Sequence, residues 1–164
     1  MGEVEKHYFL DTNYLLNFLS FRNKKLSKVI AAKHEQIQVA NSVIKSLEKH
    51  IKVPIIVVAE TVHQLHELGV NVGISELMVF ETSYLKREHL CYFVKLMHKL
   101  SEKDPMLESM DCMIVAFSLA DPQCVGLLTF DANLHSNRAI QDVLRETFTD
   151  RDFVITDDPR SRKR

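Results

Sequence analysis

The sequence predicts an α/β protein in which short parallel strands alternate with helices. Short runs of β-branched and other apolar residues are separated by longer segments whose apolar residues recur with the period of a helix. This alternation is typical of βαβ units, which place parallel strands side by side in one sheet. The 164 residues suffice for one domain with one hydrophobic core. We expect about four short strands, interleaved with about five to seven helices.

The first part of the chain is expected to begin with a strand and continue into helices. His7 to Leu10 has the composition of a strand, and Tyr14 to Leu19 follows it as an apolar helical turn. Asp11 or Thr12 is a suitable N-cap for that turn. Leu26 to about His50 carries apolar residues at the spacing of one long amphipathic helix.

The middle of the chain is expected to hold one more strand and two helices. The β-branched residues of Ile51 to Val53 favour a short strand. Pro54 to Leu68 is predicted to be a helix, because proline is favoured at a first helical position and Gly69 follows as a stop. Glu81 to Lys103 is predicted to be a second long helix.

The last third is expected to contain two helices, two strands and a tail. In chain order we predict a helix from Glu108 to Leu119, a buried strand from Val125 to Thr129, a helix capped by Ser136 and running to about Glu146, and a strand from Phe153 to Thr156. Residues 1–156 would form the domain, and residues 157–164 (DDPRSRKR) would form a basic, flexible tail.

Composition and charge describe an ordered protein without an overall affinity for nucleic acid. Hydrophobic residues make up 46% and charged residues 26%, and the formal net charge is −1. Any surface that binds nucleic acid must therefore be local. Cys91, Cys112 and Cys124 fit no zinc or disulfide spacing, and we expect them to be small buried thiols in a reducing cytoplasm. The start of the chain, MGEVEKHYF, lacks the layout of a signal peptide, and no run reaches the roughly 18 apolar residues of a membrane span.

Two aspartates follow predicted strands at their carboxyl ends. Asp11 comes directly after the strand that ends at Leu10, and Asp131 comes shortly after Thr129. Ligands in open α/β sheets bind beyond the carboxyl ends of the strands. Each aspartate also has a structural alternative, Asp11 as a helix N-cap and Asp131 as a turn residue.

Two further acids interrupt apolar helical segments. Glu60 lies within VVAETV and Asp111 within MDCMIVA. A charge among apolar neighbours is costly unless it faces solvent, a partner or a metal ion. Either residue could lie on a solvated helix face, but the four acids taken together favour a shared site.

The order and context of these acids resemble the PIN-domain nuclease family, which includes the VapC-type toxin ribonucleases of toxin–antitoxin pairs. The segments that carry the resemblance are FLDTN at 9–13, PIIVVAE at 54–60, DCMIVA at 111–116 and LLTFD at 127–131. The similarity extends over about residues 7 to 156. The stretch between Gly69 and Leu85 has no counterpart in the family pattern.

The resemblance implies a three-layer α/β/α fold with a short, mostly parallel sheet of about four to five strands. It also implies a metal-dependent ribonuclease, expected to be an endoribonuclease, that hydrolyses phosphodiester bonds with a metal-activated water. The expected catalytic and metal-binding residues are Asp11, Glu60, Asp111 and Asp131, supported through hydrogen bonds by Thr12, Asn13 and Thr129. Single-stranded or structured RNA would be the substrate, and an antitoxin protein and a second copy of the chain would be partners.

The expected metal is Mg²⁺ or Mn²⁺, because both ions prefer carboxylate and water oxygens to imidazole or thiolate ligands. Such an ion lowers the pKa of a bound water and neutralises charge on phosphoryl oxygens. His63 and His66, three residues apart near Glu60, are an alternative metal pair that would need a third ligand. Glu108 is a candidate auxiliary acid, one helical turn before Asp111.

For two groups of residues the sequence allows two roles. Arg22, Lys24, Lys25 and Lys28 form a local basic cluster that could contact phosphates or lie in a solvated loop. Apolar residues of the long helix that we predict up to Lys103 suit either the core or a dimer face; they are Tyr92, Phe93, Leu96, Met97 and Leu100.

Two other classes of phosphoryl-transfer protein have a similar α/β fold. A response-regulator receiver needs paired acids near the first strand, and a haloacid-dehalogenase-like phosphatase needs Asp-x-Asp after it. Thr12 and Asn13 follow Asp11, and this disfavours both. The remaining alternative is a catalytically silent PIN-like module that binds nucleic acid or protein.

Overall fold

The computed structural model describes residues 5–162 and contains one five-stranded sheet in which every pairing is parallel. The spatial order of the strands is β3-β2-β1-β4-β5. Their bounds are β1 His7–Leu10, β2 Ile51–Pro54, β3 Glu81–Ser83, β4 Cys124–Leu128 and β5 Val154–Thr156. The chain crosses from one half of the sheet to the other between β3 and β4, and β1 is the central strand, with β2 and β4 on either side of it. The expected short, parallel α/β sheet is confirmed.

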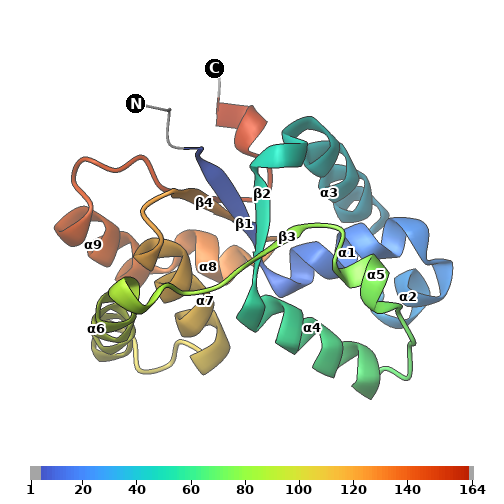
Figure 1. Cartoon of the computed structure of the whole chain (residues 1–164), viewed down its shortest axis with the longest axis horizontal. Coiled ribbons are helices and arrows are strands. Elements are labelled where there is room, and N and C mark those ends of the chain that lie inside the picture. Colours follow the sequence, from blue (N-terminus) through green and yellow to red (C-terminus); the bar gives the residue numbers. More distant parts are fainter. Residues whose placement is uncertain (1–4, 163–164) are drawn as a thin grey trace.

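Nine α-helices and two short 3-10 helices occur within residues 5–162. They are α1 Thr12–Arg22, α2 Lys24–Val29, α3 His34–Leu47, η1 Glu48–His50, α4 Ile55–Glu67, α5 Ile74–Leu77, α6 Arg87–Lys103, α7 Ser109–Ala120, α8 Ala132–Ser136, α9 Arg138–Thr147 and η2 Pro159–Arg162. Figure 1 shows α1, α2 and α3 on one side of the strands and α6, α7 and α9 on the other, consistent with three α/β/α layers. Across residues 5–162, no helix combines the length and hydrophobicity that a membrane crossing requires.

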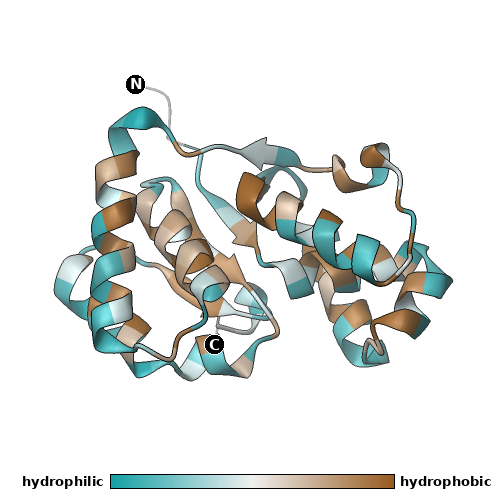
Figure 2. Cartoon of the chain, turned by 90° about the horizontal axis from the view of Figure 1, so that it is seen from below, coloured by the Kyte–Doolittle hydropathy of each residue, from teal (hydrophilic) through white to brown (hydrophobic). Residues whose placement is uncertain are grey.

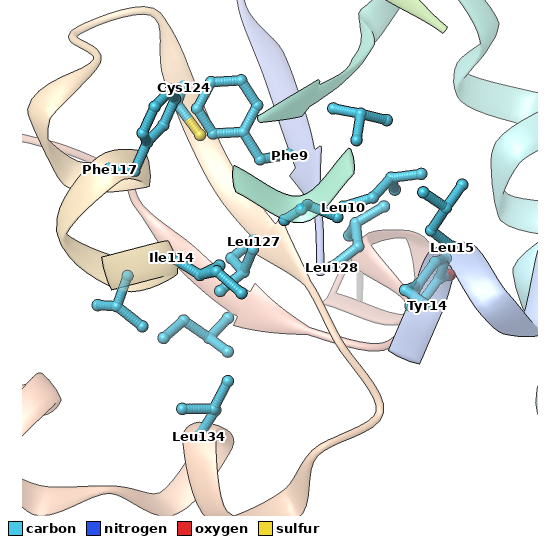
Figure 3. Close-up of a cluster of buried hydrophobic side chains, with 14 of the residues drawn as sticks. Phe9, Leu10, Tyr14, Leu15, Ile114, Phe117, Cys124, Leu127, Leu128 and Leu134 are labelled. Carbon is cyan, nitrogen blue, oxygen red and sulfur yellow. The ribbon is translucent and has the colours of Figure 1, made fainter. Parts of the chain in front are cut away.

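The core lies on both faces of β1 and its neighbour β4. The fully buried side chains of β1 and β4 include Phe9, Leu10, Leu127 and Leu128, and these pack between Ile114 and Phe117 of α7 and Tyr14 and Leu15 of α1 (Figure 3). Helices that cover such a sheet need only one apolar face, and brown and teal residues alternate along several of them in Figure 2. A Cβ on Gly126 would lie 2.7 Å from the carbonyl oxygen of Val154, so a side chain there would push β5 away from β4.

The prediction of one helix from Leu26 to His50 was wrong. The segment divides into α2 and α3, and the chain turns between them at Ala31, which has a φ of 49°. A left-handed backbone at a residue other than glycine is uncommon, and no glycine or proline marks the break. Leu26 and Ile37 are both buried, so the helical spacing of apolar residues continues across the turn and hides it.

The prediction of a helix that starts at Glu81 was also wrong. Residues Glu81–Ser83 form the edge strand β3, which pairs with β2, and α6 starts only at Arg87. The Lys52 ammonium lies 2.8 Å from the Glu81 carboxylate across this pairing. A three-residue edge strand with exposed and half-buried side chains has no apolar pattern, so tertiary pairing decides its conformation.

Two smaller predictions need correction. Asn137, not Ser136, caps α9, and its side-chain oxygen accepts a hydrogen bond from the N–H of Ile140 at 3.0 Å. Ser136 instead ends α8. Cys112 and Cys124 are buried free thiols as expected, but Cys91 is exposed, because it faces outward on α6.

The described part of the C-terminal tail folds against the body of the protein. The Tyr14 hydroxyl donates a hydrogen bond to the carbonyl oxygen of Asp157 at 2.7 Å. Arg160 pairs with Asp158 at 2.7 Å and donates to the Ser42 hydroxyl at 2.8 Å. Residues 163–164 of the predicted tail lie outside the described residues.

Candidate functional site

Asp11 lies at the carboxyl end of β1, where the strand passes directly into α1. It is the N-cap of that helix, and its Oδ1 accepts a hydrogen bond from the N–H of Thr12 at 2.7 Å. Only 4% of the residue is exposed. Asp11 is therefore the N-cap of α1, and it also lies at the strand end, the position where α/β proteins bind ligands.

Thr129 joins the ends of β1 and β4. Its hydroxyl donates a hydrogen bond to Asp11 Oδ2 at 2.7 Å and accepts one from the N–H of Asp131 at 3.0 Å. The amide of Asn13 donates to the same hydroxyl at 3.2 Å, and its oxygen accepts from the N–H of Phe130 at 3.1 Å. These contacts hold the Asp11 carboxylate and the backbone before Asp131 in one orientation.

Glu60 reaches the same region from α4, the helix that follows β2. The Thr12 hydroxyl donates a hydrogen bond to Glu60 Oε2, and the Gln64 side chain donates to Oε1 at 3.2 Å. Glu60 is only partly exposed. The hydroxyls of two supporting residues named from the sequence thus donate to different acids of the site, that of Thr12 to Glu60 and that of Thr129 to Asp11.

Asp111 and Asp131 line a hollow of about 510 Å³ beside this hydrogen-bonded group. Asp111 lies in the first turn of α7, and Asp131 is the N-cap of α8, where its Oδ1 accepts from the N–H of Asn133 at 2.7 Å. Glu108, the N-cap of α7, and Asp104 also line the hollow. The described lining contains no lysine, arginine or histidine.

The acids act on one another electrostatically. The pKa of Asp11 is raised from 3.8 to about 6, mainly by burial; the hydrogen bonds from Thr129 and Thr12 oppose this rise, and the charges of Glu60 and Asp131 add to it. Burial likewise raises the pKa of Asp111 from 3.8 to about 6, with added contributions from Asp11, Asp131, Glu108 and Glu60. Carboxylates that raise one another's pKa form a region of excess negative charge.

The described side chains are not gathered tightly around one point. Within residues 5–162, no group of three His, Cys, Asp or Glu residues is arranged to hold a metal ion. Both oxygens of Asp11 and both of Glu60 accept hydrogen bonds from protein groups. The donor chemistry nevertheless suits a hard divalent cation, because the residues that share this negative region are carboxylates.

The other sequence candidates lie elsewhere. Three lysines of the basic cluster are exposed on α2, and the Arg22 guanidinium packs over the Phe18 ring with its centre 5.5 Å from the ring centroid. None of the four lines the acidic hollow. His63 and His66 are exposed on α4, and His63 lies 3.5 Å from Glu67. Leu96 and Leu100 belong to the core, whereas Tyr92 is 36% exposed.

Two residues that support the site were missed in the sequence. Gln64 lies four residues after Glu60 on one helix, so the helical spacing could have identified it. His135 on α8 contacts the carbonyl oxygen of Thr129 through Nε2 at 2.9 Å. No local pattern marks His135, because its partner lies across the turn that carries Asp131.

Comparisons of the chain with protein-family models, with curated protein sequences and with solved structures found no match.

Proposed function

We propose that the protein is a metal-dependent ribonuclease of the PIN type. The observation that supports this most strongly is the electrostatic coupling of Asp11, Glu60, Asp111 and Asp131 at the carboxyl end of the sheet. These acids come from four separate segments of the chain, yet two of them, Asp11 and Asp111, have pKa values raised first by burial and then by the charges of the other acids. Strongly perturbed carboxylates that gather beside a hollow are typical of functional sites.

Mg²⁺ or Mn²⁺ is the cofactor that this region suits, with Asp11, Glu60, Asp111 and Asp131 as its ligands. Such an ion, when bound, lowers the pKa of a water molecule and neutralises charge on a phosphodiester. The negative charge of the hollow explains why a cation is needed, because Asp111, Asp131 and Glu108 repel a phosphate by themselves.

The neighbouring residues of the chain orient the acids. Thr129 and the Thr12 N–H hold the two oxygens of Asp11, each at 2.7 Å. Gln64 holds Glu60 from the same helix. Asp111 and Asp131 are left at the wall of the hollow, where they are accessible to a substrate. Groups that fix the orientation of metal ligands raise both metal affinity and activity.

The substrate that accompanies this proposal is RNA, single-stranded or structured, cut by endonucleolytic hydrolysis. Support for RNA comes from the resemblance of the acidic segments to PIN-domain nucleases. The same resemblance supports the finer proposal that the protein is the toxin of a toxin–antitoxin pair, with an antitoxin protein and a second copy of the chain as partners.

Cleavage of a fluorescent single-stranded RNA with Mn²⁺ tests the proposal. Asp111→Asn removes one charge from the hollow and keeps the shape of the side chain. We expect it to reduce the initial rate at least about 100-fold, as loss of a metal ligand should. Asp150→Asn is the matched control, because Asp150 is an exposed aspartate that does not line the hollow.

Three outcomes discriminate between the candidate functions. A metal-dependent rate that falls in Asp111→Asn and not in Asp150→Asn supports the nuclease. Binding of RNA without cleavage at any tested Mn²⁺ or Mg²⁺ concentration would favour the catalytically silent module. Cleavage that persists in Asp111→Asn, or in excess chelator, would exclude this acidic site as its source.

A further inference from the structure

A second hollow, of about 590 Å³, opens between α1, α3 and the segment that leads into β3. Its lining includes Ile51 and Lys52, the first residues of β2, so it lies toward the amino end of the sheet. It shares no lining residue with the acidic hollow at the carboxyl end. We propose that this second hollow binds a nucleoside monophosphate, either as a free nucleotide or as one unit of a single-stranded RNA.

The first observation is the side-chain amide of Asn41, which lacks a partner although the residue is only 9% exposed. Asn41 lines the hollow from α3, one helical turn before Ile44 and Lys45 on the same wall. The amide has no hydrogen-bond partner among residues 5–162, and neither of its polar atoms is among the fully enclosed side-chain atoms that lack a partner there. It is therefore reached from the hollow. Because buried polar groups nearly always have a partner, a ligand in the hollow would supply it.

The second observation is an apolar, partly aromatic wall around this amide. Phe18 and Phe80 lie with their ring centroids 5.3 Å apart, and both line the hollow together with Ile44 and Ile51. Phe80 is half-buried and the adjacent Val79 is 45% exposed, so the described residues leave part of this wall uncovered. Such a wall with one amide suits a flat ring that carries hydrogen-bonding groups on its edge, and a nucleobase is a ring of this kind.

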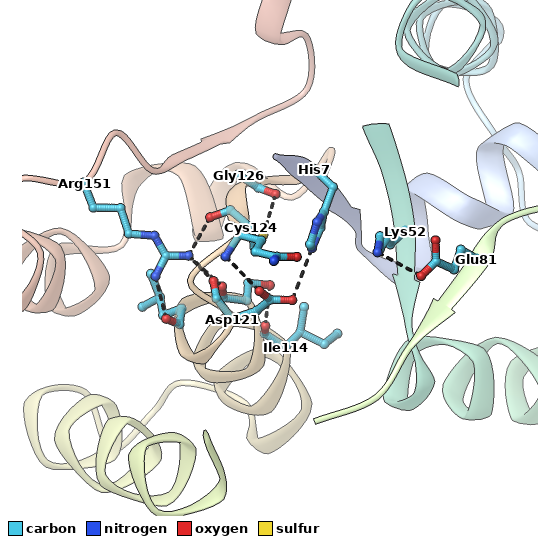
Figure 4. Close-up of polar contacts among 11 residues, drawn as sticks. His7, Lys52, Glu81, Ile114, Asp121, Cys124, Gly126 and Arg151 are labelled. Carbon is cyan, nitrogen blue, oxygen red and sulfur yellow. Dashed lines mark hydrogen bonds and ion pairs between the residues drawn. The ribbon is translucent and has the colours of Figure 1, made fainter. Parts of the chain in front are cut away.

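The charges of the lining favour an anion. Lys52 and Glu81 pair with each other at 2.8 Å across β2 and β3 (Figure 4), so their charges cancel. The charged residues of the lining that enter no ion pair among residues 5–162 are three cations and two exposed acids: Arg22, Lys45, Lys49, Glu5 and Glu48. The hollow therefore keeps an excess of positive charge, and ammonium and guanidinium groups bind phosphate oxygens through charge-assisted hydrogen bonds.

The three features together favour a nucleotide over simpler ligands. Inorganic phosphate would leave the amide and the apolar wall unused, and a nucleoside without phosphate would leave the cations unused. An asparagine amide both donates and accepts, so it can pair with the edge of a base, and with adenine it can form two hydrogen bonds at once. The volume of about 590 Å³ lies within the range of small-molecule sites, roughly 300–1,000 Å³.

Titration of ¹⁵N-labelled protein with adenosine 5′-monophosphate, in excess chelator and at constant ionic strength, tests the proposal. We expect saturable shifts of the Asn41 side-chain amide and of the backbone amides of Lys49 and Phe80, with Kd on the order of 0.1 mM. Adenosine and ribose 5-phosphate should each bind at least about tenfold more weakly, because each lacks part of the contacts. Absence of saturable shifts with the nucleotide, or a smaller difference from either fragment, would overturn the proposal.

A 5′-phosphorylated adenosine trinucleotide distinguishes the two sources of the nucleotide. An affinity at least about tenfold above that for the mononucleotide would identify single-stranded RNA as the source, and a smaller ratio would identify the free nucleotide. The chelator removes the metal ion on which the proposed ribonuclease activity depends, so the probe stays intact. The outcome therefore does not depend on whether the acidic site cuts RNA.

Asn41→Leu removes the amide and keeps a side chain of similar size. An unpartnered buried polar group is costly and leucine is not, so the free energy of unfolding should stay the same or rise. The Kd for the nucleotide should rise at least about tenfold. Wild-type affinity in Asn41→Leu would overturn the proposal, and so would a loss of stability, because it would mean that the amide already has a structural partner.

Lys49→Gln tests the contribution of the cations. It should weaken nucleotide binding at least about threefold and leave adenosine binding unchanged, because adenosine carries no phosphate. Lys95→Gln is the matched control, since Lys95 is an exposed lysine of α6 outside the lining of the hollow. Equal effects of the two substitutions on nucleotide binding would mean a general attraction of anions to the surface and would overturn the proposal.

Discussion

The two ends of the sheet treat buried ionisable groups in opposite ways. At the carboxyl end, Asp11 and Asp111 face other carboxylates, and burial together with this repulsion raises the pKa of each to about 6. Near the amino end, burial also acts to raise the pKa of Asp121, but hydrogen bonds from His7 and the N–H of Gln123 outweigh it and leave the pKa lowered. Paired charges are typical of structural support, and like charges held together are typical of a binding site.

Arg151 strengthens the contrast, because it holds the amino end of β4 against the end of α7. Its guanidinium donates to the carbonyl oxygens of Leu119 at 2.7 Å and Cys124 at 2.5 Å, and also to that of Asp121. The rings of Phe148 and Phe153 pack against it. Substitutions at the carboxyl end should therefore affect activity most, and those near the amino end should affect stability most.

The largest expected effect is that of Asp11→Asn on RNA cleavage. The substitution removes a carboxylate that interacts electrostatically with Glu60 and Asp131, so we expect the rate to fall about 1,000-fold, or about 4 kcal/mol of transition-state stabilisation. The free energy of unfolding should not decrease, because a buried charge near other charges is removed. Initial rates with Mn²⁺ and urea unfolding measure the two quantities. An unchanged rate would contradict the assignment of activity to the carboxyl end of the sheet.

Arg151→Met should give the largest loss of stability near the amino end. Several carbonyl oxygens lose a charged donor, and we expect the free energy of unfolding to fall by about 3 kcal/mol in urea. Arg145→Met, at an exposed arginine of α9, should cost far less. RNA cleavage by Arg151→Met, measured well below its unfolding midpoint, should remain within about twofold of wild type. A larger drop in cleavage would mean that the two ends are coupled.

Thr129→Val tests the connection between the ends of β1 and β4 at the acidic site. Valine keeps the shape of threonine but removes the hydroxyl that Asp11, Asp131 and Asn13 share. We expect a reduction in activity of about 10- to 100-fold and a loss of about 1–3 kcal/mol in stability. Thr129→Ser should restore most of both, since it returns the hydroxyl. Full activity in Thr129→Val would show that Asp11 is oriented without this hydroxyl.

The smallest expected effect is a change in the pH dependence of stability in Asp121→Asn. The pKa of Asp121 in the folded protein lies below its ordinary value of 3.8, so its pairing stabilises the fold fully above that value. The stabilisation is lost as the pH falls below about 4 toward the lowered pKa. Asp121→Asn should flatten the acid side of the stability curve by up to about 1 kcal/mol, whereas Asp150→Asn should not. Identical curves for Asp121→Asn and wild type would contradict the pairing with His7.

Local sequence patterns were enough to predict four of the five strands. Each of these four strands is a short, mostly apolar run beside a segment with helical periodicity, so the sequence pattern agrees with the fold. They are His7–Leu10, Ile51–Pro54, Cys124–Leu128 and Val154–Thr156. Asp11, Glu60, Asp111 and Asp131 stood out for a related reason, since a charge in or beside such a run calls for an explanation. Their approach to one another follows from the parallel order of the strands.

Contacts between distant segments decided the rest. Edge strand β3 forms by pairing with β2, and the turn at Ala31 lets both α2 and α3 pack against α1. Thr129 meets Asp11 across 118 residues of sequence, and His7 meets Asp121 across 114. A periodic pattern records which face of an element is buried, but it does not record which distant side chain lies opposite. Most strands and helices, and the four acids, could therefore be predicted from the sequence. The hydrogen bonds that orient the acids, and the pairing of His7 with Asp121 near the amino end of the sheet, form only when the sheet assembles.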